Sequence, residues 1–334
     1  MAREMDFLYV SARIKALETK LLGKSAIDRI LEADGPEEAL KVLSDTDYGS
    51  DIAEMDNIYD FEKVLAKSLK RTYKDVADSL KDNNIIKFFT LKQDYHNLKV
   101  LIKGKIIGVS GRPYISELGT ISVEEMEKLI DEDVTAMVPE TMKNAYREAM
   151  SIYESSQDPQ QIDLILDRAL YEELYKVVLS INNDLLQSYF KALVDLTNIK
   201  TMFRLIRMKA DIRVLERALL PGGTIGKETF ERLFGEPVQS IIESFASSPY
   251  GNIVEKGLSA WESSNSAAVL ERLSDDYLLN MVKKGLYKPF GAETVIGYLV
   301  ARENEVKNLR ILLVGKINRI PSEMIKERLR DVYV

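Results

Sequence analysis

The 334-residue sequence contains no cysteine and a single histidine. Without cysteine the chain has no disulfides, no thiolate nucleophile and no cysteine-ligated metal. A single histidine, His96, excludes a multi-histidine metal site, and no nearby motif supplies the carboxylate or serine partners of a catalytic imidazole. We therefore interpret His96 as an ordinary helical residue and expect no cofactor.

Proline and long apolar runs are also scarce. Nine prolines interrupt the chain, and no stretch reaches the roughly 18–20 uncharged apolar residues of a membrane-spanning helix. Hydrophobic residues make up 46% and charged residues 30%, a mixture typical of amphipathic helices. The N-terminal stretch MAREMDFLYVSARIK carries charges where a signal peptide is apolar, so export is not expected. We predict an all-α protein.

The sequence also lacks clustered positive charge. It has 46 Lys and Arg against 53 Asp and Glu, a net charge of −7, and the two signs alternate along the chain. Binding to nucleic acid depends on clustered basic side chains that contact phosphates. We therefore expect no nucleic acid partner.

The sequence contains only incomplete matches to nucleotide-binding and magnesium-binding motifs. The run PGGTIGKE from Pro221 lacks the first glycine and the final hydroxyl residue of a phosphate-binding loop, and Gly23-Lys24-Ser25 has Glu18 in place of the first glycine. Asp275-Asp276 has neither a third aspartate nor a second acidic cluster for a magnesium site, and we interpret it as a solvated helix N-terminus. We expect neither a nucleotide, nor a metal, nor a direct small-molecule substrate.

One signature occurs three times: an acidic residue, two variable positions, Asn, an aliphatic residue and a basic residue. Its copies are DYHNLK, DLTNIK and EVKNLR, and their asparagines are separated by 101 and 110 positions. Apolar neighbours at steps of three and four predict that each copy lies on a helix with one buried stripe. The nine key residues are Asp94, Asn97, Lys99, Asp195, Asn198, Lys200, Glu305, Asn308 and Arg310.

Two interpretations of this signature remain open. In the first, it is a helix start whose Asp or Asn ties down backbone amides while the base is solvated. In the second, Lys99, Lys200 and Arg310 contact a partner protein. The residues alone favour the structural interpretation.

The intervals between the signatures resemble one another too. ELGTISVEEMEKL from Glu117 aligns with PGGTIGKETFERL from Pro221, and we predict that Thr120 and Thr224 are helix N-caps. We expect helical repeat units at 1–93, 94–194 and 195–301, followed by a closing helix and C-terminal tail at 302–334.

A fourth, degraded copy is predicted near the N-terminus in ARIKALETKLLGK. Leu17 precedes Gly23-Lys24 by the interval that separates Leu98 from Gly104-Lys105. If the first and last helices are copies of one element, we expect the chain ends to meet and close a pseudo-threefold ring.

The segments DYHNLKVLIKGK, DLTNIKTMFRLIRMK, ENEVKNLRILLVGK and LETKLLGKSAIDRILEAD resemble the C subunit of prokaryotic V/A-type ATPases, which is related to the d subunit of the eukaryotic vacuolar ATPase. The resemblance covers nearly the whole chain. It implies a funnel-shaped, all-α molecule of three similar domains in a pseudo-threefold arrangement.

What the resemblance implies about function is a non-catalytic connector. Such a protein is peripheral, lies on the cytoplasmic face of the membrane proteolipid (c/K) ring, and receives the central stalk subunits D and F. The alternative is an all-helical scaffold or adaptor that binds another cytosolic protein through a concave surface, and an enzyme ranks third.

Overall fold

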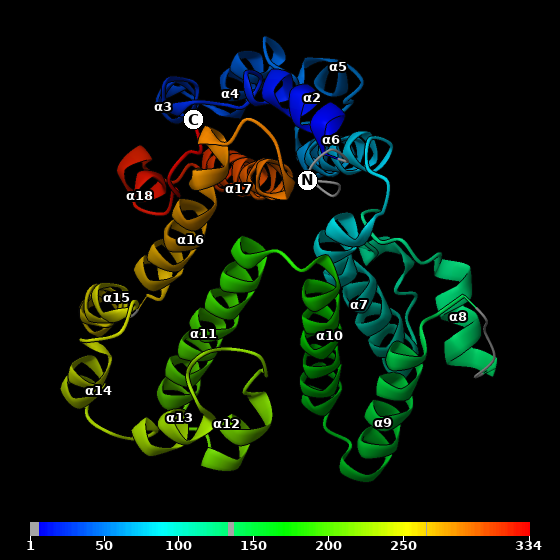
Figure 1. Ribbon diagram of the computed structural model, residues 1–334, viewed down its shortest axis with the longest axis vertical. Coiled ribbons are helices and arrows are strands. Elements are labelled where there is room, and N and C mark those ends of the chain that lie inside the picture. Colours follow the sequence, from blue (N-terminus) through cyan, green and yellow to red (C-terminus); the bar gives the residue numbers. More distant parts are fainter. Residues whose placement is uncertain (1–6, 133–136, 265) are drawn as a thin grey trace. The chain divides into compact units, whose positions relative to one another are not determined.

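The computed structural model describes residues 7–132, 137–264 and 266–334, and within these ranges every regular element is a helix (Figure 1). The predicted all-α class is confirmed. The chain divides into two compact units, unit 1 with Met1–Asp82 and Glu236–Val334, and unit 2 with Asn83–Gly235. The boundaries 1–93, 94–194, 195–301 and 302–334 remain a prediction, because the two units follow packing rather than sequence similarity.

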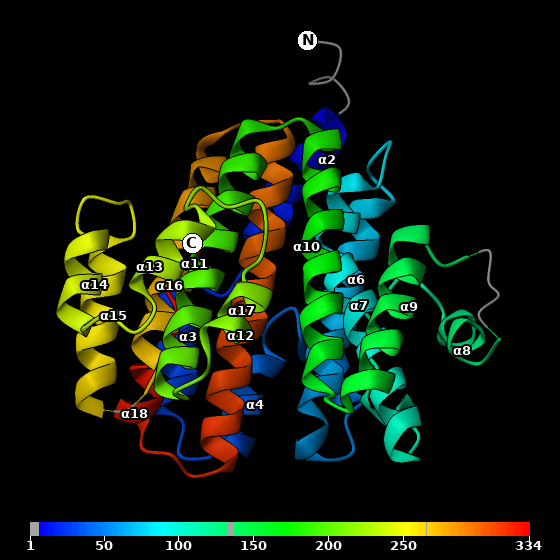
Figure 2. The same ribbon diagram turned by 90° about the horizontal axis from the view of Figure 1, so that it is seen from below.

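Unit 2 is organised around long helices that pack side by side. Figure 2 shows α7 and α9 lying alongside α10, and these are the neighbours that pack together. Its helices are α7 (Asn84–Ile107), α8 (Val123–Glu132), α9 (Glu140–Ser156), α10 (Gln160–Ile181), α11 (Asp184–Arg207), α12 (Ile212–Ala218) and α13 (Lys227–Leu233).

Unit 1 combines helices from both ends of the chain. The N-terminal part contributes α2 (Leu8–Glu18), α3 (Lys24–Glu32), α4 (Pro36–Ser44), α5 (Gly49–Ala53) and α6 (Phe61–Ala77). The C-terminal part contributes α14 (Val238–Phe245), α15 (Gly251–Ser264), α16 (Ala268–Val282), α17 (Ala292–Ile317) and α18 (Ser322–Lys326). Short 3-10 helices lie at Ile58–Asp60 and Lys283–Tyr287, and at Arg112–Tyr114 in unit 2.

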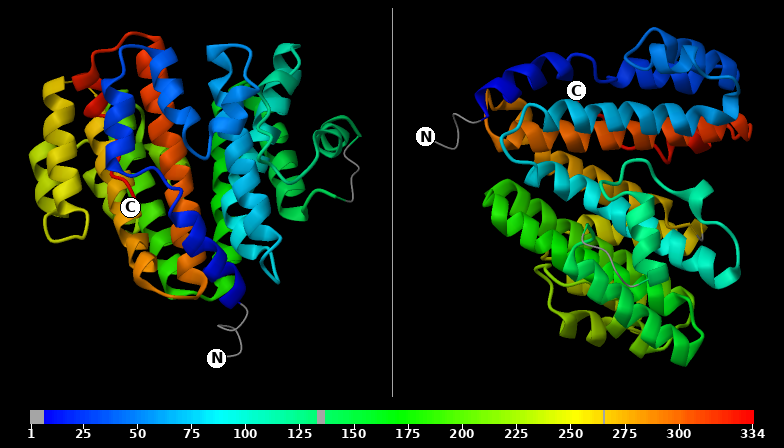
Figure 3. Two further views of the ribbon diagram at one scale, coloured as in Figure 1. Left: turned by 90° about the horizontal axis from the view of Figure 1, so that it is seen from above. Right: turned by 90° about the vertical axis from the view of Figure 1, so that its right-hand side faces the viewer.

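Helix α17 is the centre of unit 1. It packs against α2, α3, α4, α6, α16 and α18, and the right-hand view of Figure 3 shows α6 running along it. Nineteen of its 26 residues are buried, so it is covered on nearly all sides, unlike a surface helix with one apolar stripe. Several of its polar residues, among them Arg302, Glu305 and Asn308, are therefore also buried and need partners inside the protein.

Helices α7, α11 and α17 end in the same way, which repeats the period of the sequence in backbone geometry. Each is followed by a residue in the left-handed region: Gly108 (φ 73°), Lys209 (φ 53°) and Arg319 (φ 53°). The amide after each of these residues bonds to a carbonyl five positions back, as in a Schellman cap. Only the first copy uses glycine, so the sequence alone did not reveal this feature.

The predicted fourth copy near the N-terminus is wrong. Helix α2 ends at Glu18, and Gly23 is the N-cap of α3, whereas Gly104 lies inside the last turn of α7. The match therefore equated a helix start with a helix end. The terminal helices do meet within unit 1, where α2 packs on α17, whereas the closed pseudo-threefold ring stays a prediction.

No helix among the described residues is both long and apolar enough to cross a membrane.

A core substitution on α7 tests the predicted stripe. Leu98 is fully buried, so Leu98→Ala should destabilise unit 2 by about 2–5 kcal/mol through lost burial and a residual cavity. Urea unfolding monitored by circular dichroism measures this change in the free energy of unfolding. Ile107→Ala on the same helix is the control, because Ile107 is 72% exposed, and an equal loss from both variants would contradict the assignment.

Candidate functional site

The repeated signature lies in the middle of long helices rather than at helix starts. Asp94 is ten residues into α7, and Asp195 and Glu305 are similarly deep in α11 and α17. The interpretation as a helix start is therefore wrong. The expectation that its Asp and Asn tie down backbone amides describes what they do, but the amides belong to loops more than fifteen residues downstream.

In the first copy, Asp94 and Asn97 hold one loop from two points. Asp94 Oδ1 accepts the backbone N–H groups of Thr120 (2.6 Å) and Ile121 (3.0 Å), while Oδ2 accepts the Thr120 hydroxyl (2.8 Å). The Asn97 side chain accepts the N–H of Ser116 and donates to its carbonyl. Burial raises the pKa of Asp94, and the three donors oppose that shift.

The second copy repeats this arrangement atom for atom. Asp195 accepts the N–H groups of Thr224 (2.8 Å) and Ile225 (3.0 Å) and the Thr224 hydroxyl (2.5 Å). Asn198 accepts the N–H of Leu220 and donates to its carbonyl. We call each such set, in which a helix Asp and Asn bind a downstream loop, a loop clamp.

The glycine before each threonine allows the loop to approach the carboxylate. A Cβ on Gly119 would lie 2.8 Å from Asp94 Oδ1, and one on Gly223 would lie 2.2 Å from Asp195 Oδ1. The shared Gly-Thr-Ile of the two intervals is thus explained by contact with the helix. Thr120 and Thr224 are not N-caps as predicted, because α8 and α13 begin three residues later and the hydroxyls donate to the aspartates.

In the third copy the asparagine keeps its role and the acid changes partners. Asn308 accepts the N–H of Arg330 and donates to its carbonyl, as in the other copies. Asn304, one turn earlier, donates to the carbonyl of Asp331. The two Gly-Thr-Ile loops bind the aspartates of the first two copies, and Glu305 has other partners.

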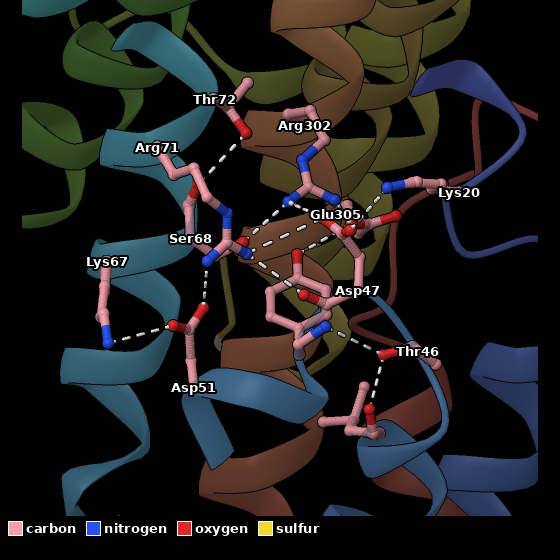
Figure 4. A network of polar contacts seen from close by, with 12 residues as sticks. Lys20, Thr46, Asp47, Asp51, Lys67, Ser68, Arg71, Thr72, Arg302 and Glu305 are labelled. Atoms are coloured by element: carbon pink, nitrogen blue, oxygen red, sulfur yellow. Dashed lines mark hydrogen bonds and ion pairs between the residues drawn. The ribbon is translucent and has the colours of Figure 1, made fainter. Parts of the chain in front are cut away.

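Glu305 instead occupies the centre of a buried polar cluster (Figure 4). Its Oε2 accepts the N–H of Leu22 (2.5 Å), and its Oε1 accepts the Tyr48 hydroxyl (2.7 Å) and Arg302 Nη1 (2.6 Å). Arg302, only 2% exposed, also donates to Ser68 Oγ of α6. Burial raises the pKa of Glu305, and the Arg302 guanidinium opposes that rise.

Comparison with known proteins assigns the chain to a protein family. Residues 10–328 match the ATP synthase (C/AC39) subunit family. The chain belongs to this family.

Relatives match almost end to end. The C subunit of the V-type sodium ATPase of Enterococcus hirae is 28% identical over 331 residues, 98% of this chain and 99% of the relative. The C subunit of the A-type ATP synthase of Methanothermobacter thermautotrophicus is 30% identical over 344 residues, covering 97% and 87%. That of Methanocaldococcus jannaschii is 26% identical over 347 residues, covering 97% and 86%. The resemblance seen in the motifs is confirmed.

The three basic residues of the signature have different environments in this C/AC39 subunit. Lys99 pairs with Asp167 of α10 inside unit 2, and Arg310 forms a two-bond pair with Glu62 of α6 inside unit 1. Lys200 is half-buried on α11. The six acids and asparagines of the signature are buried, so a partner contact remains a prediction for the three bases alone.

Sequence reasoning missed Arg302, Tyr48 and Leu22. Arg302 directly follows the uncharged run TVIGYLVA of α17, and Glu305 comes three residues later, a spacing that brings opposite charges together on one helix face. Nothing in the sequence indicates that Leu22 and Tyr48, more than 250 positions away, donate to Glu305. The described residues include no group of three or more acidic or histidine side chains able to hold a metal ion.

Asp275-Asp276 is not a solvated helix N-terminus as predicted. Both residues lie in the middle of α16, where Asp275 pairs with Arg330 and Lys307. Asp276 is 8% exposed and accepts the N–H of Asp331. Burial, with repulsion from Asp331 and Asp275, raises the pKa of Asp276 to about 6, against that N–H and the Arg272 guanidinium.

This carboxyl should make stability depend on pH. Because its pKa is raised in the folded protein, its contribution is fully present below about pH 4 and is lost as pH rises through about 6. Asp276→Asn stays neutral and keeps an acceptor for Asp331. The wild type should therefore lose about 2 kcal/mol relative to Asp276→Asn between pH 4 and 7. Urea unfolding at each pH measures the difference, and a constant difference would refute the assignment.

Removal of one loop clamp should lower the free energy of unfolding more than removal of one exposed side-chain amide. Asn198→Ala removes two hydrogen bonds and leaves the N–H and carbonyl of Leu220 without them, so we expect a loss of about 2–4 kcal/mol. The control, Asn318→Ala, removes an exposed amide that bonds to Val314 and should cost below about 1 kcal/mol. Equal effects in thermal and urea unfolding would show that the clamp does not hold the loop.

Proposed function

We propose that this chain is the non-catalytic central-stalk connector of a V/A-type rotary ATPase, linking the rotating D–F shaft to the membrane proteolipid ring. In this role it couples ion transport to ATP synthesis or hydrolysis that other subunits carry out. The observation that carries the proposal is the family match over residues 10–328, with relatives named as C subunits of such ATPases that align along nearly their whole length.

The internal construction of the units supports a part that transmits force. Close-packed helices are stiff and transmit strain, and the loop clamps fix two long connections of unit 2 to the helices that precede them. A hydrogen bond donated by a loop amide to a buried helix side chain restricts independent movement of the loop. Such units can carry torque between a narrow shaft and a wide ring without yielding at their connections.

The same proposal places the protein at the cytoplasmic face of the membrane, peripheral and held through the complex. Its partners would be the stalk subunits D and F on one side and the proteolipid (c/K) ring on the other. The predicted ring-shaped, three-domain funnel and the predicted domain boundaries belong to this proposal.

The alternative is an all-helical adaptor for another cytosolic protein. Both roles need stiff helical units, so the fold does not separate them. The family match favours the connector.

A pull-down from host membranes tests the proposal. The tagged chain should recover the D and F subunits together with an apolar ring protein of a few membrane-spanning helices, identified by mass spectrometry after gentle solubilisation. The tag alone is the control for nonspecific capture. Recovery of unrelated cytosolic proteins without D, F or the ring protein would replace the connector with the adaptor.

A further inference from the structure

The acid of the third signature copy receives its backbone donor from the opposite end of the chain. In the first two copies Ile121 and Ile225 donate to Asp94 and Asp195 from loops downstream. In the third, Leu22 donates to Glu305 from 283 positions upstream. The donor comes from a different part of the sequence, but it bonds to the same position of the signature helix, the acid.

The helix that follows each donor starts at the same distance. Ile121 is followed two residues later by the start of α8, Ile225 by the start of α13, and Leu22 by the start of α3. The sequences correspond without a gap: ISVEEMEKL, IGKETFERL and LGKSAIDRI. The buried positions coincide as well, with Met126, Phe230 and Ile27 on one turn and Leu129, Leu233 and Ile30 on the next.

The C-terminal tail lies next to the start of the segment that begins at Leu22. Asn308 holds Arg330, as Asn97 holds Ser116 and Asn198 holds Leu220. The carbonyl oxygen of Val334 then lies 3.8 Å from where a Cβ on Gly23 would be. Helix α18 of the tail packs on α3.

We infer that the third copy of the repeat is assembled from two separate parts of the chain, residues 292–334 followed in space by residues 22–82, and that Glu305 closes the non-covalent joint between them. The face of α17 around Glu305 is then a binding surface whose partner is the segment 22–82 of this protein. The Gly23-Lys24 pair belongs to the Gly226-Lys227 position of the repeat.

Glu305 makes more contacts at the joint than the aspartates of the other copies make with their loops. Thr120 and Thr224 stay close to their aspartates because a covalent loop of about thirty residues connects them. Leu22 has no such short connection to α17, so we expect additional contacts to hold it there. Glu305 has the longer side chain and adds bonds to Arg302 and Tyr48. The position of Arg302 is Leu91 in the first copy and Ala192 in the second, so this guanidinium is specific to the joint.

Cleavage of the full, folded chain tests the joint. A site for a specific protease is inserted between Asp82 and Asn83, in the link between α6 and α7, and the cut protein is analysed by gel filtration and dilution. Residues 1–82 should stay bound to the remainder. Glu305→Gln should weaken that binding about 10-fold and Glu305→Ala about 100-fold or more, because both leave buried donors without a charged acceptor.

The matched control is Arg310→Ala. It removes an ion pair with Glu62 between the same two fragments, but this pair is about half exposed and should change the binding less than about 5-fold. If neither Glu305 variant weakens retention beyond Arg310→Ala, Glu305 does not close the joint and the inference is overturned.

A circular permutant gives an independent measurement when a variant fails to fold. Its chain runs from Asn83 to Val334, through a flexible linker of about twelve Gly and Ser residues, and then from Met1 to Asp82. It should fold with the wild-type circular dichroism spectrum and a melting temperature within about 5 °C. A permutant that is unfolded, while the uncut chain carrying the same linker at its C-terminus is folded, would overturn the inference.

Discussion

The structure depends on the rule that a polar group taken out of water must find a partner inside the protein. The helices that carry the repeated signature run through the cores of their units, and the acid and asparagine of each signature copy are buried. Each therefore binds backbone amides or carbonyls of a segment remote in sequence. These bonds decide where the loops lie, which in turn decides where the next helix begins.

The sequence was sufficient for the fold class and for the spacing of the repeat. Helical periodicity placed Leu98 on a buried stripe, and the acid and asparagine were correctly expected to tie down amides. The position of those amides could not be predicted, because a helix start and a loop clamp use the same side-chain chemistry. The N-cap prediction for Thr120 and Thr224 failed for the same reason.

The N-terminal Gly-Lys pair shows the limit of matching short motifs by interval. Gly104-Lys105 and Gly23-Lys24 are identical as letters, but one pair ends a helix and the other begins one. The letters alone do not distinguish a glycine inside the last turn of one helix from a glycine at the N-cap of another. The buried spacing of Ile27 and Ile30 is the signal that identifies the second pair, and it becomes visible only when the partners on α17 are known.

The loop clamps also affect how the protein moves over time. Backbone amides in connections usually exchange with solvent within the fastest class, since nothing holds them between fluctuations. The amides of Ser116, Thr120 and Ile121 instead donate to side chains of α7, so they are protected by bonds to a core helix. We therefore expect the clamped amides of both loops to exchange more slowly than those of ordinary connections.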